Sequence, residues 1–285
     1  NLGVQLIIRN REGSSKLTPA GEYWHKVSAE ILEHMDTVTK VHEETYLTSN
    51  VKISLGVTPN LRGNFISSAA RIAQEQEHYL KFELVTAESS ARLVEKLRLH
   101  KINCAVVSDT DLIEDAASYK ITKLFEDQIA WVVPSAVSNQ DIRDAIQLVK
   151  VPKDKNPVLR RYVDVAQQMF TKHGARDWFS INLPESVASF STPSFVAAVD
   201  LVAAGLATST VALSLVPNLS SSVLRKVKFF EIEGTRINAV LAVRKHLMSH
   251  SSYAHFHNQL VEYCRDEYWP AMKSLKMEKF SLFRN

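Results

Sequence analysis

The N-terminal stretch LGVQLIIRNREGSSKLTPAGEYW, residues 2–24, opens the pattern around which the rest of the chain is organised. Thr18 and Pro19 predict the start of a helix, with the threonine as N-cap and the proline at the first helical position. Apolar residues then recur every three or four positions, which places them on one stripe of a helix of about thirty residues. The stripe consists of Ala20, Trp24, Val27, Ile31, Met35, Val38 and Val41.

A narrow apolar stripe on so long a helix is typical of a coiled-coil seam rather than of an ordinary core helix. We therefore expect a homodimer that forms through one set of residues along the stripe. This set is Trp24, Val27, Ile31, Met35 and Val38. The polar residues at 48–50 predict a hinge between the helix and the body of the protein.

The residues before the helix have the pattern of a hairpin, with strands at 5–9 and 15–17 and a turn between them. A hairpin with basic residues at its tip is suited to contact DNA phosphates or the minor groove. Arg9, Arg11 and Lys16 would supply positive charge, and Asn10 a hydrogen bond. The alternative is a solvated hairpin whose charges only aid solubility. Charge alone favours that alternative, whereas the helix pattern that follows favours DNA contact.

A spaced set of residues in this stretch carries a family resemblance. The set is Leu2, Gly3, Val4, Leu6, Arg9, Gly13, Leu17, Thr18, Ala20 and Gly21. It resembles the last part of a LysR-type winged-helix domain that runs into the linker helix of that family. The resemblance implies a base-reading helix upstream, so DNA would be a partner through the full-length protein. The chain begins at Asn1 rather than Met, and we expect an N-terminal segment to precede it.

The composition is that of a globular protein, with 285 residues of which 45% are hydrophobic and 23% charged. The formal net charge of +3 permits nucleic-acid binding without arguing for it. Cys104 and Cys264 make no disulfide framework, which favours a reducing compartment and a cytoplasmic location. No apolar run approaches the ~20 residues of a membrane span, and no signal-peptide pattern is seen, so no membrane partner is expected.

Strand and helix patterns alternate in the next part of the chain. Strands are predicted at 51–57, 81–86 and 103–108, and helices at 62–77 and 89–99, with Ser89 as the N-cap of the second helix. This order argues for a parallel sheet covered by helices, in which ligands lie at the carboxyl ends of the strands. Residues 58–61 and 108–110 follow two such ends. Further along the chain, a helix is expected over 158–173.

Four later segments extend the resemblance to about residue 270. VKISLGVTPNL (51–61) resembles the first strand and turn of the LysR effector domain, and INCAVVSD (102–109) its third strand. LFEDQIAWVVP (124–134) resembles the crossover into the second subdomain. LVAAGLATSTVALSL (201–215) resembles a helix-Gly-strand segment, although Ala207 and Ala212 replace a usual Gly and Pro.

The resemblance implies an α/β fold, namely a two-lobed periplasmic-binding-like effector domain preceded by a wing remnant and a long linker helix. The remnant of a winged helix-turn-helix domain would occupy residues 1–17, and the linker and dimerisation helix residues 18–50. Lobe I would comprise residues 51–127 and 245–285, and lobe II residues 128–244. The implied function is that of a DNA-binding transcriptional regulator. The resemblance also adds a homotetramer as an alternative to the dimer.

The resemblance further implies that a small-molecule effector binds between the two lobes and controls the regulator. Helix N-termini at both sides of the cleft favour an anionic effector, such as a carboxylate. The candidate residues are Thr58, Pro59, Asn60, Leu61, Ser108, Trp131, Ser191, Thr192 and Pro193. Trp131 would form a wall of the cleft. The alternative is that Thr58 and Thr192 only cap helices.

No catalytic or metal-binding motif is present, since the chain lacks HExxH, CxxC, GxSxG and a Gly-rich phosphate loop. We therefore expect no enzyme activity, no cofactor and no metal. His255 and His257 point to different sides of a predicted helix, which favours packing over zinc binding. Cys104 lies in a predicted strand and is interpreted as a small hydrophobe rather than a redox sensor. The rival function is a two-lobed solute-binding protein for a small anionic metabolite.

Overall fold

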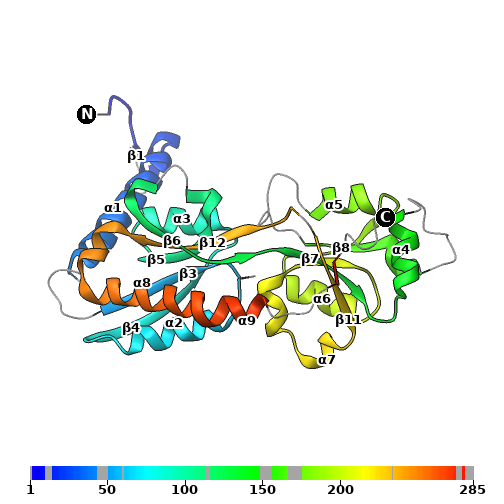
Figure 1. Cartoon of the computed structure of the whole chain (residues 1–285). Helices are drawn as coiled ribbons and strands as arrows, with labels where there is room; N and C mark the ends of the chain where they lie inside the picture. The colour runs from blue at the N-terminus through cyan, green and yellow to red at the C-terminus, as the bar shows by residue number, and fades with distance from the viewer. Residues whose placement is uncertain are drawn as a thin grey trace.

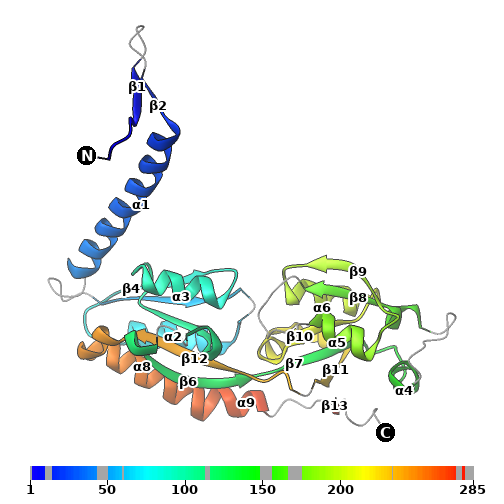
Figure 2. The ribbon, with the colours of Figure 1, turned by 90° about the horizontal axis from the view of Figure 1, so that it is seen from above.

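The computed structural model consists of an arm and two lobes (Figures 1 and 2). It describes residues 2–9, 15–43, 51–59, 61–112, 116–147, 156–165, 175–232, 234–273 and 278–279. The expected two-lobed α/β fold is confirmed. Each lobe has its own sheet, and strands that leave one lobe continue directly into the other.

The arm is a short hairpin followed by a long helix. Strand β1 (Ile7–Arg9) pairs antiparallel with β2 (Ser15–Leu17), and α1 (Pro19–His42) follows. The predicted cap is confirmed, because the Gly21 N–H donates to Thr18 Oγ1 at 3.0 Å. A Cβ at Gly21 would collide with the carbonyl oxygen of Leu6. The glycine therefore allows the chain before β1 to pack closely against the start of α1.

Lobe I is built on a five-stranded sheet in the order β4-β3-β5-β12-β6. Its strands are β3 (Val51–Val57), β4 (Tyr79–Thr86), β5 (Cys104–Ser108), β6 (Tyr119–Asp127) and β12 (Ile237–Arg244). Its helices are α2 (Asn64–Gln74), α3 (Ser90–Arg98) and α8 (Ser251–Tyr263). Helices α2 and α8 pack on one face and α3 on the other, so successive residues of β5 enter opposite cores.

Strand β12 lies in the lobe I sheet, whereas the expected division at residue 244 assigns it to lobe II. It fills the gap between β5 and β6 and pairs antiparallel with both. Its residues from Ala239 to Arg244 are buried, so the sheet would have an open apolar slot without it. Strand β13 (Glu278–Lys279) also departs from the expected division, because it pairs with the sheet of lobe II.

Lobe II surrounds β7 (Ile129–Pro134), the central strand of its four-stranded sheet. The other elements are α4 (Asn139–Gln147), β8 (Arg161–Val165), α5 (Ala175–Asn182), β9 (Val187–Thr192), α6 (Phe195–Ala203), β10 (Ser209–Ala212), α7 (Ser221–Leu224) and β11 (Val227–Glu231). Strands β10 and β11 flank β7 in this sheet, β8 and β9 form a separate two-stranded sheet, and the helices complete the lobe. The expected helix over 158–173 is wrong for residues 161–165, which form β8 parallel to β9.

Two crossover segments join the lobes, one at Gln128 and one from Ile232 to Ile237. The Gln128 side chain ties them together. Its amide Nε2 donates to the Glu231 carboxylate at 3.0 Å and to the Ile232 carbonyl at 2.9 Å. This side chain therefore links the two segments directly.

Candidate functional site

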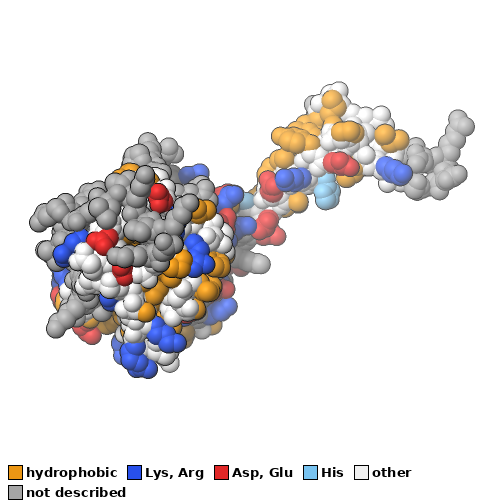
Figure 3. Space-filling view, turned by 90° about the vertical axis from the view of Figure 1, so that its right-hand side faces the viewer, with side chains coloured by type: hydrophobic (Ala, Val, Ile, Leu, Met, Phe, Trp, Pro, Cys, Tyr) orange, Lys and Arg blue, Asp and Glu red, His pale blue; other side chains and the backbone are white. Residues whose placement is uncertain are grey.

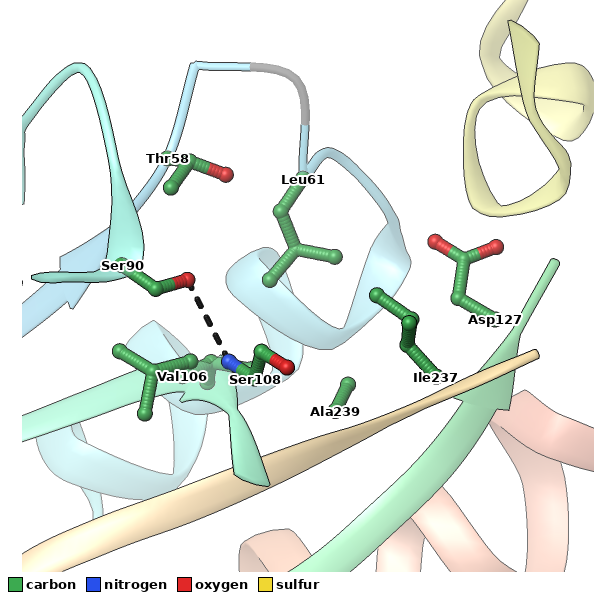
Figure 4. Close-up of a pocket in the computed structure, with 9 residues that line it drawn as sticks. Thr58, Leu61, Ser90, Val106, Ser108, Asp127, Ile237 and Ala239 are labelled. Atoms are coloured by element: carbon green, nitrogen blue, oxygen red, sulfur yellow. Dashed lines mark hydrogen bonds between the residues drawn. The ribbon is translucent and has the colours of Figure 1, made fainter. Parts of the chain in front are cut away.

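A small cavity lies where strands β3 and β5 of lobe I end, and the two crossover segments help to line it (Figure 4). Its volume is about 10 Å³, roughly the room for one water molecule. Nine residues line it. They are Thr58, Leu61, Ser90, Val106, Val107, Ser108, Asp127, Ile237 and Ala239. The carboxyl ends of parallel strands are the usual place for a ligand in such a sheet.

Three hydroxyl side chains make the polar wall of this cavity, and the chain fixes each of them locally. Thr58 directly follows β3, and the Leu61 N–H donates to its carbonyl oxygen at 3.0 Å. Ser108 ends β5, and its N–H donates to Ser90 Oγ at 3.3 Å. The hydroxyl groups of Ser108 and Thr110 lie 2.8 Å apart. The Ser90 and Ser108 hydroxyl groups are therefore held by hydrogen bonds, and Thr58 is held through its backbone.

Asp127, the last residue of β6, lies at the lobe junction and is 1% exposed. Its Oδ1 accepts from the N–H groups of Gln128 at 2.9 Å and Ser214 at 3.0 Å. Its Oδ2 accepts from the Ser214 hydroxyl at 2.6 Å. Burial raises the pKa of the Asp127 carboxyl, and these hydrogen bonds only partly oppose that effect. Asp127 thus anchors the 3₁₀ segment η5 (Leu213–Asn218) of lobe II to the crossover.

The structure brings together three of the expected effector residues, namely Thr58, Leu61 and Ser108. Pro59 is exposed and does not line the cavity, and Asn60 lies outside the described residues. The helix-cap alternative does not apply to Thr58 at α2, because Gly63 occupies the N-cap position of that helix.

Expected residues from lobe II do not line this cavity. Trp131 is 0% exposed and packs in the core of lobe II, with its ring 5.3 Å from Trp178 and 5.5 Å from Phe230. It therefore forms no wall of the cavity. Ser191, Thr192 and Pro193 lie at the junction of β9 and α6. There Ser194 caps the helix, and Thr192 Oγ1 accepts from the Ser194 N–H at 3.2 Å.

Six lining residues were not expected from the sequence, namely Ser90, Val106, Val107, Asp127, Ile237 and Ala239. Two of them carry a signal that sequence reasoning could have used. Ser90 follows the predicted cap Ser89, and Asp127 is a carboxylate at a strand end. Ile237 and Ala239 carry none, because nothing local in β12 says that it will lie beside β5.

The arm presents the expected dimerisation stripe to solvent. Ile31 is 52% exposed, Met35 61% and Val38 41%, while Trp24 and Val27 are partly buried. Figure 3 shows hydrophobic side chains along this arm. Of the expected DNA contacts, Lys16 is exposed on β2 and Arg9 ends β1. Asn10 and Arg11 lie outside the described residues.

Histidine and cysteine side chains have packing roles where their contacts are seen. His257 is buried, and its Nε2 lies 2.9 Å from the Thr122 hydroxyl. Cys104 and Cys264 are both buried free thiols. Among the described residues, no group of three His, Cys, Asp or Glu side chains is placed to hold a metal ion. Within the same ranges, no helix has the length and hydropathy needed to cross a membrane.

Comparison with known proteins identifies one family. Residues 50–265 match the family model described as LysR substrate binding domain, while no curated protein matches the chain significantly in sequence. An OxyR mutant from Corynebacterium glutamicum has 17% identity and a TM-score of 0.57, covering 98% of this chain and 85% of that one. Full-length CbnR in complex with its target DNA has 15% identity and a TM-score of 0.55, covering 87% and 83%. The C-terminal domains of a LysR family protein from Agrobacterium tumefaciens have 16% identity and a TM-score of 0.53, covering 76% and 97%.

Proposed function

The chain belongs to the LysR family of transcriptional regulators, and we propose that the lobe I cavity is where a small-molecule effector controls it. The observation that carries this proposal is the hydroxyl wall of Thr58, Ser90 and Ser108 at the carboxyl edge of the sheet. A buried wall of this kind offers directional hydrogen bonds to a polar metabolite, and the apolar side chains around it exclude water.

The cavity is too small for a metabolite as it stands, so binding requires the two lobes to separate and close again around the ligand. A ligand that prefers one lobe arrangement shifts the population toward that arrangement. Because α1 joins the hairpin to lobe I, a change in lobe arrangement can alter how two arms are held in a dimer. That change would reach the DNA-reading heads without any covalent chemistry.

The effector we propose is a small carboxylate. In Figure 4, Thr58 and Asp127 lie to either side of Leu61. Helix α2 begins at Asn64, shortly after Leu61, and the dipole at its N-terminus favours an anion nearby. The Asp127 carboxyl would disfavour an anion beside it, so a carboxylate would bind on the Thr58 side of the cavity.

Two further proposals concern the assembly of the protein and its contacts with DNA. We propose a homodimer through the exposed α1 stripe, with a tetramer as the alternative. Lys16 and Arg9 of the hairpin would contact DNA backbone in the full-length protein, which would act in the cytoplasm where the DNA lies. A solute-binding protein, the rival function, gives no role to an arm with an exposed apolar stripe, and family membership favours the regulator.

A thermal-shift screen tests the proposed site, using this chain with small carboxylates, amino acids and aromatic acids. Ligand at about a hundred times its dissociation constant should add roughly 2.7 kcal/mol of stability. We expect Thr58→Val to abolish the shift, because it removes the hydroxyl and keeps the shape of the side chain. Thr192→Val is the matched control in lobe II. A hit that survives both Thr58→Val and Ser108→Ala would place the effector elsewhere.

A further inference from the structure

The C-terminal residues do not end on lobe I, although α8 belongs to it. A π-helical turn (Cys264–Tyr268) and α9 (Trp269–Lys273) extend α8 toward lobe II, and β13 then joins the lobe II sheet (Figure 2). The family model matches only as far as residue 265. Most of this segment therefore lies beyond the residues that the family model matches.

The first anchor of this segment is in the core of lobe I. Tyr268 is 6% exposed and Met272 8% exposed, and both belong to the core that α2 and α8 build. The Tyr268 ring packs against Phe65 and Phe125, with centroids 5.4 Å and 5.0 Å apart. A Cβ at Gly63 would collide with this ring. The start of α9 is therefore held firmly on lobe I.

The second anchor is on lobe II. Strand β13 pairs parallel with β11, with Glu278 opposite Phe230 and Lys279 opposite Glu231. Strand β11 in turn pairs with the central strand β7. Six residue steps separate Met272 from Glu278, and a chain of that length spans at most about 20 Å. Lobe separation beyond that reach must detach one of the two anchors.

We propose that α9 and β13 form a strap that limits the opening of the two lobes. The strap is a third connection between them, added to the two crossover segments. Its release from β11 lets the lobes separate, and its attachment keeps the cavity beside Thr58 small. Only the consequence for effector entry rests on the proposed function. The mechanical role of the strap does not depend on any ligand.

The test measures the distance between the lobes without a ligand. Spin labels at Ser67→Cys on α2 and Ser222→Cys on α7 report that distance, because both positions are exposed and both native thiols are buried. Labelled protein is diluted with unlabelled protein so that each distance comes from one chain. In the strap variant, Glu278→Pro and Lys279→Pro remove the N–H groups needed for pairing with β11. The matched control replaces the same two residues by alanine.

We expect a longer mean distance and a broader distribution for the proline pair, and no change for the alanine pair. A chain ending at Lys273 should behave like the proline pair, which separates loss of the strap from a local effect of proline. The inference would be overturned if the native protein, the proline pair, the alanine pair and the shortened chain all had the same distribution of inter-lobe distances. Since no effector enters this experiment, a failed ligand screen would leave the inference intact.

Discussion

Asn218 of lobe II donates a hydrogen bond from Nδ2 to the carbonyl oxygen of Arg62 in lobe I, at 3.2 Å. The same amide also donates to the Ser214 carbonyl at 3.2 Å. Arg62 directly follows Leu61, which lines the cavity. Because this contact bridges the lobes at the rim of the cavity, separation of the lobes must break it.

Replacing Asn218 tests this contact. Asn218→Asp keeps the shape of the side chain but turns a carboxylate toward two carbonyl oxygens, so we expect it to favour separated lobes. Asn218→Ala removes the hydrogen bonds without repulsion and should cost about 0.5–1.5 kcal/mol at most, because the site is exposed. Inter-lobe distances from the spin-label pair measure the effect. If the aspartate variant shows the native distance distribution, the contact does not hold the lobes.

Asp127 should make the stability of the lobe junction depend on pH. Its folded-state pKa is raised from 3.8, chiefly by burial, so the folded protein favours the protonated form. Its contribution to stability is therefore complete below pH 3.8 and is lost as pH rises through the folded-state pKa. We expect Asp127→Asn to gain stability relative to the native protein as pH increases from 4 to 8. Urea unfolding at several pH values measures the difference, and the opposite slope would contradict it.

His100 should make the junction between α1 and lobe I sensitive to acid. Its ring lies 6.3 Å from that of His34 on α1 and 6.1 Å from that of His246, and Arg244 bonds its Nδ1. Burial, aided by Arg244, lowers the pKa of His100 to about 4. The stability of this cluster is thus full above pH 6.5 and is lost as pH falls toward 4.

His100→Gln should remove that loss, since glutamine stays neutral throughout. Unfolding free energies at pH 7 and pH 5 provide the measurement, with His255→Gln on the exposed side of α8 as the control. The nearby Glu33 is an unsuitable source of this loss, because the hydrogen bond from Lys101, at 2.7 Å, lowers the pKa of its carboxyl. If His100→Gln loses as much unfolding free energy between pH 7 and pH 5 as the native protein does, other groups are responsible for the acid sensitivity.

The two native thiols should be inert in the folded protein. Burial raises the pKa of Cys104 strongly, and it raises that of Cys264 to about 12. Thiolate, the reactive form, is therefore scarce at neutral pH. We expect iodoacetamide to modify neither cysteine at pH 7 in the native state and both in denaturant, as read by mass spectrometry. Native-state modification of Cys104 would reopen a redox role.

The apolar stripe of α1 should hold the dimer together. Burying an exposed apolar side chain of this size stabilises by about 1.5–3 kcal/mol, so introducing charge there should weaken dimerisation at least tenfold. We expect the pair Ile31→Glu and Met35→Glu to yield monomers in sedimentation velocity. Ala29→Glu is the control, because Ala29 lies about 160° around the helix from the stripe. Dimers that survive the double substitution would require another interface.

The sequence correctly predicted features, such as helix caps, that depend on residues close together in the chain. Thr18 and Ser89 cap α1 and α3 as expected, because a cap depends only on the next three residues. The strand over 161–165 was missed, since only its pairing with β9 separates it from a short helix. Trp131 was misplaced for a similar reason. Its position beside the crossover is visible in the sequence, whereas its burial comes from β10 and β11 on either side of β7.

The cavity could be predicted only in part, for the same physical reason. Thr58 and Ser108 follow predicted parallel strands, so their meeting at one edge of the sheet follows from the topology rule. Ile237 arrives from a strand more than a hundred residues later in the chain, and no periodicity within β12 encodes its neighbour. Asp127 could be placed only in part, because its position in the crossover segment 124–134 was predicted, whereas its partner Ser214 lies in the other lobe.

The position of β12 between β5 and β6 sets an order on folding during synthesis. About 110 residues separate the end of β6 from the start of β12, and they include nearly all of lobe II. On the ribosome, lobe II is therefore made except for its edge strand β13 while the sheet of lobe I still has an empty slot. Such long-range closure slows folding and leaves apolar strand edges exposed for its duration. The lobe whose chain begins first therefore closes its sheet only after most of the other lobe has been made.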